Sequence, residues 1–206
     1  SVDAYKIAIS FRRDFLDAYY NMGIAYGSLE EIGIDVLDCA LGALKQSIRL
    51  SADFIHGYIA LGAAYIRKEE YANAMDALKR AILINSKDPN AHYYFGVALR
   101  ATKDFEKAAT SLYTSVMLKP DSLQVQYFLG LVLIDCEKFQ GACDAFKETV
   151  RIKPDFAEGY YMLGYVYHEK LLDMENGNYH LRKAEKLYLK MEDFDRLKNI
   201  RSMLVK

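Results

Sequence analysis

The sequence has little cysteine and no surplus of either charge, and both absences exclude classes of protein. Its three cysteines, Cys39, Cys136 and Cys143, are an odd number without close pairing. This pattern argues against a disulfide framework and favours a reducing compartment. Lys and Arg number 27, against 28 for Asp and Glu. Because a nucleic-acid-binding surface needs a basic surplus, we expect no nucleic-acid partner.

Long apolar runs are also missing. No uninterrupted apolar stretch is long enough to cross a bilayer, and the chain does not open on a basic segment followed by an apolar one. We therefore expect no membrane insertion and a cytoplasmic location. A signal or anchor that had been trimmed from the natural protein would escape this reasoning.

The catalytic and metal-binding motifs are incomplete. His168 and Glu169 begin like the zinc motif His-Glu-x-x-His, but Leu172 stands where the second histidine should be. Cys136 and Cys143 lack the short spacing and the histidine partners of a zinc site. No glycine-rich phosphate loop is present. We therefore predict that the protein is not an enzyme and uses no cofactor or metal; an enzyme or a small-ligand carrier is the weakest hypothesis.

Glycine, in contrast, recurs at a fixed interval. Five stretches align on one glycine each, from "AYYNMGIAYG" near the start to "GYYMLGYVYH" near the end. These glycines are Gly23, Gly62, Gly96, Gly130 and Gly164. The first interval is 39 residues and the next three are 34 residues each. A fixed period of this length is typical of a repeat architecture.

Three further series keep the same phase as the glycines. One series is always alanine, one is leucine or phenylalanine, and one is small or hydroxylated. They are Ala40, Ala74, Ala108 and Ala142; Leu44, Leu78, Leu112 and Phe146; and Ser47, Ala81, Ser115 and Thr149. Small residues at fixed steps let neighbouring helices approach closely. The pattern therefore predicts helices stacked in a row.

The pattern resembles the tetratricopeptide repeat over nearly the entire chain. The unit 123–156 matches without insertion, through Leu129, Gly130, Ala142, Phe146, Thr149 and Pro154. The last unit matches through Tyr160, Leu163, Gly164 and Tyr167, and then, after one inserted residue, through Gly177, Leu181 and Ala184. The resemblance implies an all-α, right-handed solenoid of tandem helix-turn-helix repeats with a C-terminal capping helix.

The stretch "GYYMLGYVYHE" (159–169) tests this prediction, because glycine and tyrosine are poor helix formers. Tyr160, Leu163 and Tyr167 nevertheless fall on one face of a helix. Gly164 would let the second helix of the pair pack closely, at a cost of about 1 kcal/mol in helix propensity. We predict a helix here, since packing against neighbouring repeats offsets the poor propensity.

The alignment divides the chain into seven segments. They are 1–15, the second helix of a truncated repeat; 16–54, repeat 1; 55–88, repeat 2; 89–122, repeat 3; 123–156, repeat 4; 157–191, repeat 5; and 192–206, the capping helix. Repeat 1 holds five extra residues within 28–38, which we interpret as a neutral insertion in a surface turn. Because the chain begins inside a repeat, we expect it to be part of a longer array.

The last segment has an apolar stripe formed by Phe194, Leu197, Ile200 and Leu204. Such a stripe suits a helix that covers the bare face of the final repeat. A helix that binds a partner is the alternative interpretation.

The resemblance also implies a binding surface. In this family, positions 2, 5, 9 and 12 of each repeat, here called steps, lie on the first helix and line a concave groove. The residues carried over to these steps are Tyr20, Ile24, His56, Ile59, Asn90, Tyr93, Val97, Arg100, Gln124, Tyr127, Leu131, Glu158, Tyr161, Tyr165 and His168. This composition, apolar and rich in tyrosine, suits a peptide. Tyrosine at step 5 also supports neighbouring helices in the family. The tyrosines at this step therefore either form a recognition surface or belong to the packing; they are Tyr20, Tyr93, Tyr127 and Tyr161.

One familiar role of the family is excluded by the residues at these steps. Members that grip the carboxyl terminus of heat-shock chaperones use Lys, Asn and Arg at set steps, and only Asn21 is compatible with that clamp. We therefore predict a scaffold that binds a peptide or helical segment of a partner protein without the clamp. A self-assembling adaptor is the alternative, because the opening half unit would expose Tyr5 and Phe11.

Overall fold

The computed structural model describes residues 2–27 and 34–204, and all regular elements in these ranges are helices. The chain divides into two compact units, residues 1–118 and 119–206. No helix among the described residues is long and apolar enough to cross a membrane. The predicted all-α architecture is confirmed.

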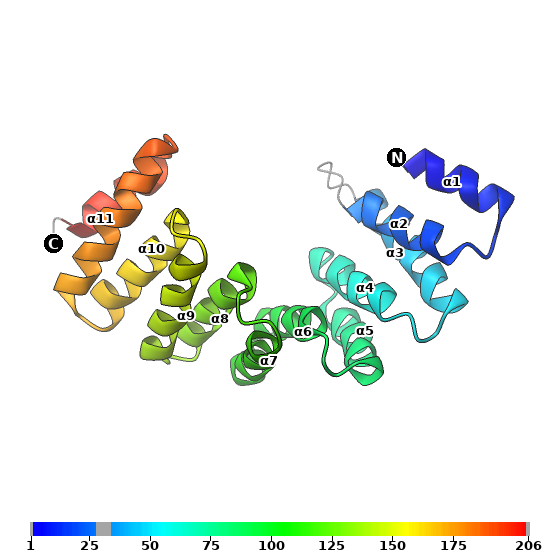
Figure 1. The fold of residues 1–206 in the computed structure, drawn as a ribbon, viewed down its shortest axis with the longest axis horizontal. Helices are drawn as coiled ribbons and strands as arrows, with labels where there is room; N and C mark the ends of the chain where they lie inside the picture. Colours follow the sequence, from blue (N-terminus) through cyan, green and yellow to red (C-terminus); the bar gives the residue numbers. More distant parts are fainter. Residues whose placement is uncertain (1, 28–33, 205–206) are drawn as a thin grey trace. The chain divides into compact units, whose positions relative to one another are not determined.

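The described residues of the first unit form a single helix followed by three helix pairs (Figure 1). Its helices are α1 (Val2–Phe11), α2 (Leu16–Gly27), α3 (Ile34–Leu50), α4 (Ile55–Arg67), α5 (Tyr71–Ile84), α6 (Pro89–Ala101) and α7 (Phe105–Leu118). The pairs are α2 with α3, α4 with α5, and α6 with α7. In addition, α4 contacts both α2 and α6, so the first helices of successive pairs lie next to one another.

The five-residue insertion expected within 28–38 falls partly on residues 28–33, which lie outside the described part of the chain. The remaining residues of that stretch belong to α3.

A glycine marks the contact between the two helices of each pair. A Cβ atom on Gly62 of α4 would stand 2.5 Å from Cγ of Leu78 in α5, and one on Gly96 of α6 would stand 2.8 Å from Cγ of Leu112 in α7. Both leucines are fully buried. Because no larger residue fits at this spacing, glycine and leucine together set how closely the helices pack. The recurring glycines of the sequence therefore have a structural reason.

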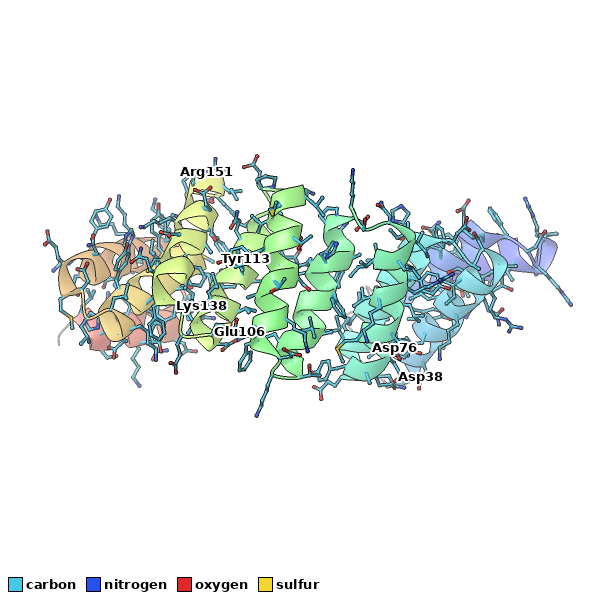
Figure 2. The ribbon with its side chains drawn as sticks, turned by 90° about the horizontal axis from the view of Figure 1, so that it is seen from below. Asp38, Asp76, Glu106, Tyr113, Lys138 and Arg151 are labelled. Atoms are coloured by element: carbon cyan, nitrogen blue, oxygen red, sulfur yellow. The ribbon has the colours of Figure 1, made fainter. Side chains whose placement is uncertain are left out.

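The second helices present their polar side to solvent. Asp38 of α3, Asp76 of α5 and Glu106 of α7 all lie on the face of the first unit that Figure 2 shows. The opposite, apolar sides of these helices carry the fully buried Ala74 and Ala108 of the sequence series. This division follows the amphipathic pattern of a helix with one face on a core.

In the second unit, the described residues up to 204 form two helix pairs and a last helix. Its elements are α8 (Leu123–Asp135), α9 (Phe139–Ile152), α10 (Ala157–Tyr165), the π-helix η1 (Val166–Lys170), α11 (Met174–Lys190) and α12 (Phe194–Leu204). The glycine contact recurs here between Gly130 and Phe146 and between Gly164 and Leu181. The stretch 159–169 is helical, as predicted, because tertiary packing outweighs its weak propensity.

The inserted residue of the last repeat is absorbed by the π-helix. In the preceding repeats, Glu69, Lys103 and Glu137 end the first helix with a positive φ, seven positions after the glycine. Leu172 takes the same backbone conformation eight positions after Gly164. A π-turn closes on one residue more than an α-turn. The first helix is therefore longer by one residue, and Gly164 still meets its partner in α11.

The final helix α12 packs on the pair α10 and α11. Leu197 and Ile200 of α12 are buried together with Ala184 and Tyr188 of α11. Phe194, the first residue of the predicted apolar stripe, is instead exposed. The contact face of α12 thus lies on the later residues of the stripe.

Candidate functional site

A cleft of about 440 Å³ opens in the first unit over α4, between α2 and α6. We call it the α4 cleft. Five of the residues predicted from the sequence line it together: Tyr20, Ile24, His56, Ile59 and Asn90. They come from α2, α4 and α6, the first helices of three successive pairs.

Two tyrosines on the neighbouring helices flank the cleft. The ring of Tyr20 in α2 makes an edge-to-face contact with Phe54, with centroids 5.1 Å apart. Tyr94 of α6 contacts the ring of Tyr93 in the same way at 5.0 Å. Burial raises the pKa of Tyr20, so its hydroxyl stays protonated near neutral pH and can donate a hydrogen bond. The walls of the cleft are thus held by aromatic packing.

The floor of the cleft consists of small residues on α4. Ala60, Ala63 and Ala64 line it. The equivalents of Ala60 in the other repeats are Asn21, Tyr94, Phe128 and Met162, and those of Ala63 are Ile24, Val97, Leu131 and Tyr165. The repeat that contains α4 therefore has the smallest residue at both steps, and the missing side-chain volume leaves the hollow. The small size of Ala60 and Ala63 is visible in the aligned sequence, although the predicted binding surface was based on other residues.

The two ends of the cleft are polar. His56 is the second residue of α4 and Arg67 is its last, so these ends lie about 16 Å apart along the helix. Asn90 stands near the start of α6, where Asp88 caps the helix by accepting from the backbone N–H groups of Asn90 and Ala91, both at 2.9 Å. The cap fixes the backbone at this end of the cleft.

Arg67 was not among the residues predicted from the sequence. Its side chain is exposed and reaches toward α2, where a Cβ on Gly27 would stand 3.7 Å from its Nη1 atom. Arg67 forms no ion pair with any residue that the structure describes, whereas its neighbour Lys68 is held by Asp38 at 2.7 Å and Glu70 at 2.8 Å. At this end of the cleft the guanidinium therefore has no acidic partner among residues 2–27 and 34–204.

The other predicted residues of the first unit lie outside the α4 cleft. Tyr93 is only 8% exposed, and its ring packs inside the helix array. Val97 and Arg100 are half-buried on α6. For Tyr93, packing is the role that the structure shows.

Among the predicted residues of the second unit, those on α8 differ in their surroundings. The ring of Tyr127 lies between Phe146 at 5.7 Å and Phe156 at 5.5 Å, so it supports the packing of α8 on α9 and the turn that follows. Gln124 is exposed and Leu131 is half-buried. These three residues line neither the α4 cleft nor the cavity beside Phe156 and Glu158.

The predicted residues on α10 are engaged by the C-terminal helices. Glu158 accepts hydrogen bonds from Arg196 Nη1 of α12 and from the hydroxyl of Tyr188 in α11. The Arg196 guanidinium also stands 6.0 Å from the ring centre of Tyr161. Tyr165 packs on the same apolar cluster as α12. Burial first, and the Glu158 carboxylate second, raise the pKa of Tyr188.

His168 lies inside the second unit and not on its surface. It is 2% exposed, and its Nδ1 stands 3.0 Å from Oε1 of Glu169. Its backbone lies against Gly177 of α11, where a Cβ would come within 3.0 Å. Such a residue cannot reach a ligand, so we leave His168 out of the candidate site.

A second cavity of about 470 Å³ lies in the second unit, beside Phe156, Glu158, Tyr188 and Met191. Two of its polar lining residues, Glu158 and Tyr188, are hydrogen-bonded to each other. Among residues 2–27 and 34–204, no group of three or more His, Cys, Asp or Glu side chains is placed to hold a metal ion.

Comparison with known proteins agrees with this architecture. Residues 67–149 match a family model described as anaphase-promoting complex, cyclosome, subunit 3. The solved structure of YrrB, described as a TPR protein with an unusual peptide-binding site, aligns over 98% of this chain and 100% of its own, with a TM-score of 0.73 and 20% identity. The chain therefore has the fold of tetratricopeptide-repeat proteins.

Two structures of MamA are similar to this chain as well. One aligns over 77% of this chain and 92% of its own, with a TM-score of 0.72 and 23% identity. The other, residues 41 to the end of MamA from Desulfovibrio magneticus RS-1, aligns over 85% and 96%, with a TM-score of 0.74 and 20% identity. At these identities the likeness shows a shared fold. No curated protein sequence matches the chain.

Proposed function

We propose that this protein is an interaction scaffold that binds a peptide segment of a partner protein in the α4 cleft. The observation that carries the proposal is the convergence of five sequence-predicted residues on one cleft, flanked by Tyr20 and Tyr94. YrrB, which has the same fold and is described as having a peptide-binding site, supports the same function.

The dimensions and chemistry of the cleft suit an extended peptide. A strand rises about 3.3 Å per residue, so the distance of about 16 Å between its polar ends corresponds to roughly five residues. Ile24 is 43% exposed at the cleft wall, and apolar surface of this kind gains free energy when a partner covers it. The tyrosines add contact area while losing few rotamers on binding.

Binding is favoured over catalysis by the residues around the cleft. The described lining contains no Ser, Thr, Cys, Asp or Glu side chain. It therefore offers no hydroxyl or thiol nucleophile of the usual kind beside a base, and no carboxylate pair. His56 alone does not make a catalytic set.

A peptide selection tests the proposal. Peptides are first selected from a random display library for binding to the wild-type protein. They should bind the Ile24→Asp variant much more weakly, because a buried charge would face the bound apolar side chain. The matched control is Leu83→Asp, since Leu83 is 74% exposed on α5 and lies away from the cleft. Peptides that bind both variants equally well would place the binding site elsewhere.

Self-association through α1 is the second candidate function. No side chain of α1 is buried, and Ile7 and Phe11 are 58% and 88% exposed. An exposed apolar face of this kind on a helix invites a second copy of the chain. Sedimentation at increasing concentration should show oligomers that Phe11→Ser removes; a monomer at all concentrations would refute this function.

A further inference from the structure

We infer that the peptide bound in the α4 cleft carries a bulky apolar side chain and an acidic side chain at positions i and i+2, in either order. In this arrangement the alanines of α4 receive the apolar group and Arg67 binds the carboxylate. The inference rests on the proposed function and adds the chemistry of the partner.

The apolar part follows from the shape of the floor. Ala60 and Ala63 stand where every other repeat has a larger residue. The hollow above them is flanked by the rings of Tyr20 and Tyr94 and closed by the side chains of Ile24 and Ile59. A cleft of about 440 Å³ with these walls holds an aromatic or long aliphatic side chain together with a stretch of backbone. Small polar side chains would leave this apolar surface uncovered.

The acidic part follows from charge. Among the described residues that line the cleft, Arg67 alone has a permanent charge, and no described residue forms an ion pair with it. The adjacent Lys68 shows the contrast, because two carboxylates already neutralise it. A guanidinium presents two parallel N–H donors that match a carboxylate. An acidic partner group is therefore complementary to this end of the cleft, and a basic one is repelled.

The spacing follows from helix and strand geometry. Ala63 and Arg67 are four positions apart on α4, so they lie about 6 Å apart on one face of the helix. In an extended peptide, side chains at positions i and i+2 point the same way and are about 6.6 Å apart. The two peptide side chains should therefore be separated by one residue.

Short synthetic peptides test the inference. Acetyl-Ser-Phe-Ser-Glu-Ser-amide and its reverse order, acetyl-Ser-Glu-Ser-Phe-Ser-amide, cover the two directions in which a strand can lie. For each peptide, the dissociation constant is compared with that of the same peptide with Gln in place of Glu. The measurement is an NMR chemical-shift titration in buffer of low ionic strength. For the preferred direction, the Glu peptide should bind the wild-type protein about three- to tenfold more tightly than the Gln peptide. The preference should shrink at high salt, because Arg67 is exposed.

Two variants with matched controls identify the groups responsible. Arg67→Gln should remove the preference, so that the Glu and Gln peptides bind equally, while Arg80→Gln, at an exposed position on α5, should keep the preference. Ala63→Leu should weaken both peptides at least about tenfold by filling the floor. Ala72→Leu, on the exposed side of α5, is its control. Circular dichroism of each variant checks that the helices are intact.

The outcomes separate this inference from the proposed function. Equal binding of the Glu and Gln peptides, with loss of both in Ala63→Leu, would overturn the role of Arg67 and leave a peptide-binding cleft. A preference for Glu that survives Arg67→Gln would likewise overturn it. If neither peptide binds in either direction, the predicted pair of side chains is wrong, and the display selection then decides by itself whether the cleft binds peptides.

Discussion

The same repeat produces a hollow in one unit and a filled surface in the other. In the first unit, two steps of α4 are occupied by Ala60 and Ala63, and a cleft lies above them. In the second unit, the same steps of α10 are occupied by Met162 and Tyr165. There the groups predicted to bind a partner are engaged within the chain, since Glu158 is bound by Arg196 and Tyr188.

The comparison separates two kinds of position in the repeat. The glycine and its partner leucine or phenylalanine are shared by both units, because they set how closely two helices pack. The steps that face away from this contact vary freely, because packing constrains them less. A difference of a few side-chain atoms at two such steps therefore decides whether a repeat offers a cleft.

The largest effect should come from the shared glycines, and it should differ between the units. A Cβ on Gly164 would stand 2.9 Å from the backbone nitrogen of Leu181, whereas the three atoms nearest a Cβ on Gly62 all belong to the side chain of Leu78. A side chain can shift more easily than backbone. We expect Gly164→Ala to lower the free energy of unfolding by about 3 kcal/mol and Gly62→Ala by about 2 kcal/mol, measured by urea titration.

Gly42 provides the control for this pair. It is exposed in α3, and a Cβ there would have no atom within 4 Å. Gly42→Ala should stabilise the helix by up to about 1 kcal/mol, because alanine has the higher helix propensity. A loss of stability in Gly42→Ala as large as in the other two variants would contradict the role assigned to the glycine contacts.

A smaller effect should come from the contact that distinguishes the second unit. Removing Arg196 leaves the partly buried carboxylate of Glu158 with Tyr188 as its remaining bound donor. We expect Arg196→Ala to cost about 1–2 kcal/mol in the free energy of unfolding, discounted for the exposure of the guanidinium. Lys79→Ala, which breaks an exposed pair with Asp76 in the first unit, should cost less than about 0.5 kcal/mol. Equal costs in the two variants would mean that Arg196 acts only at the surface.

The smallest effect should appear as a response of the second unit to acid. The His180 ring is stacked between Tyr160 at 6.2 Å and Tyr167 at 5.8 Å, and burial lowers its pKa, with a further lowering from Lys147. The unfolded state therefore binds the proton more readily than the folded state, and stability falls as the pH drops below about 6.5. The His180→Phe variant keeps an aromatic ring at this place but has no group that binds the proton. Its melting temperature should therefore fall less on acidification than that of the wild-type protein.

Melting curves between pH 7.5 and 5.0 measure this difference. The carboxylates titrate in both the wild-type protein and His180→Phe, so comparing the two isolates the contribution of the imidazole. Parallel curves for the two proteins would show that His180 does not couple protonation to folding.

Much of the fold could be predicted from the sequence because its determinants are local and periodic. The interval between glycines predicted the helix pairs. The alignment of the repeats also showed one inserted residue in the last repeat, and the structure accommodates it in the π-helix η1. Five residues of the α4 cleft were also among those assigned from the family's steps. Arg67 was missed because it stands just beyond those steps, although the small size of Ala60 and Ala63 was readable in the alignment.

By itself, then, the sequence determined that this chain forms paired helices and which face of each first helix carries its variable residues, since spacing along a helix fixes the face. The tertiary structure alone decided which of those residues reach solvent. Glu158 and Arg196 lie 38 positions apart, His168 lies against Gly177 of α11, and Tyr93 is buried. Burial depends on such distant partners, whose packing no periodic pattern specifies.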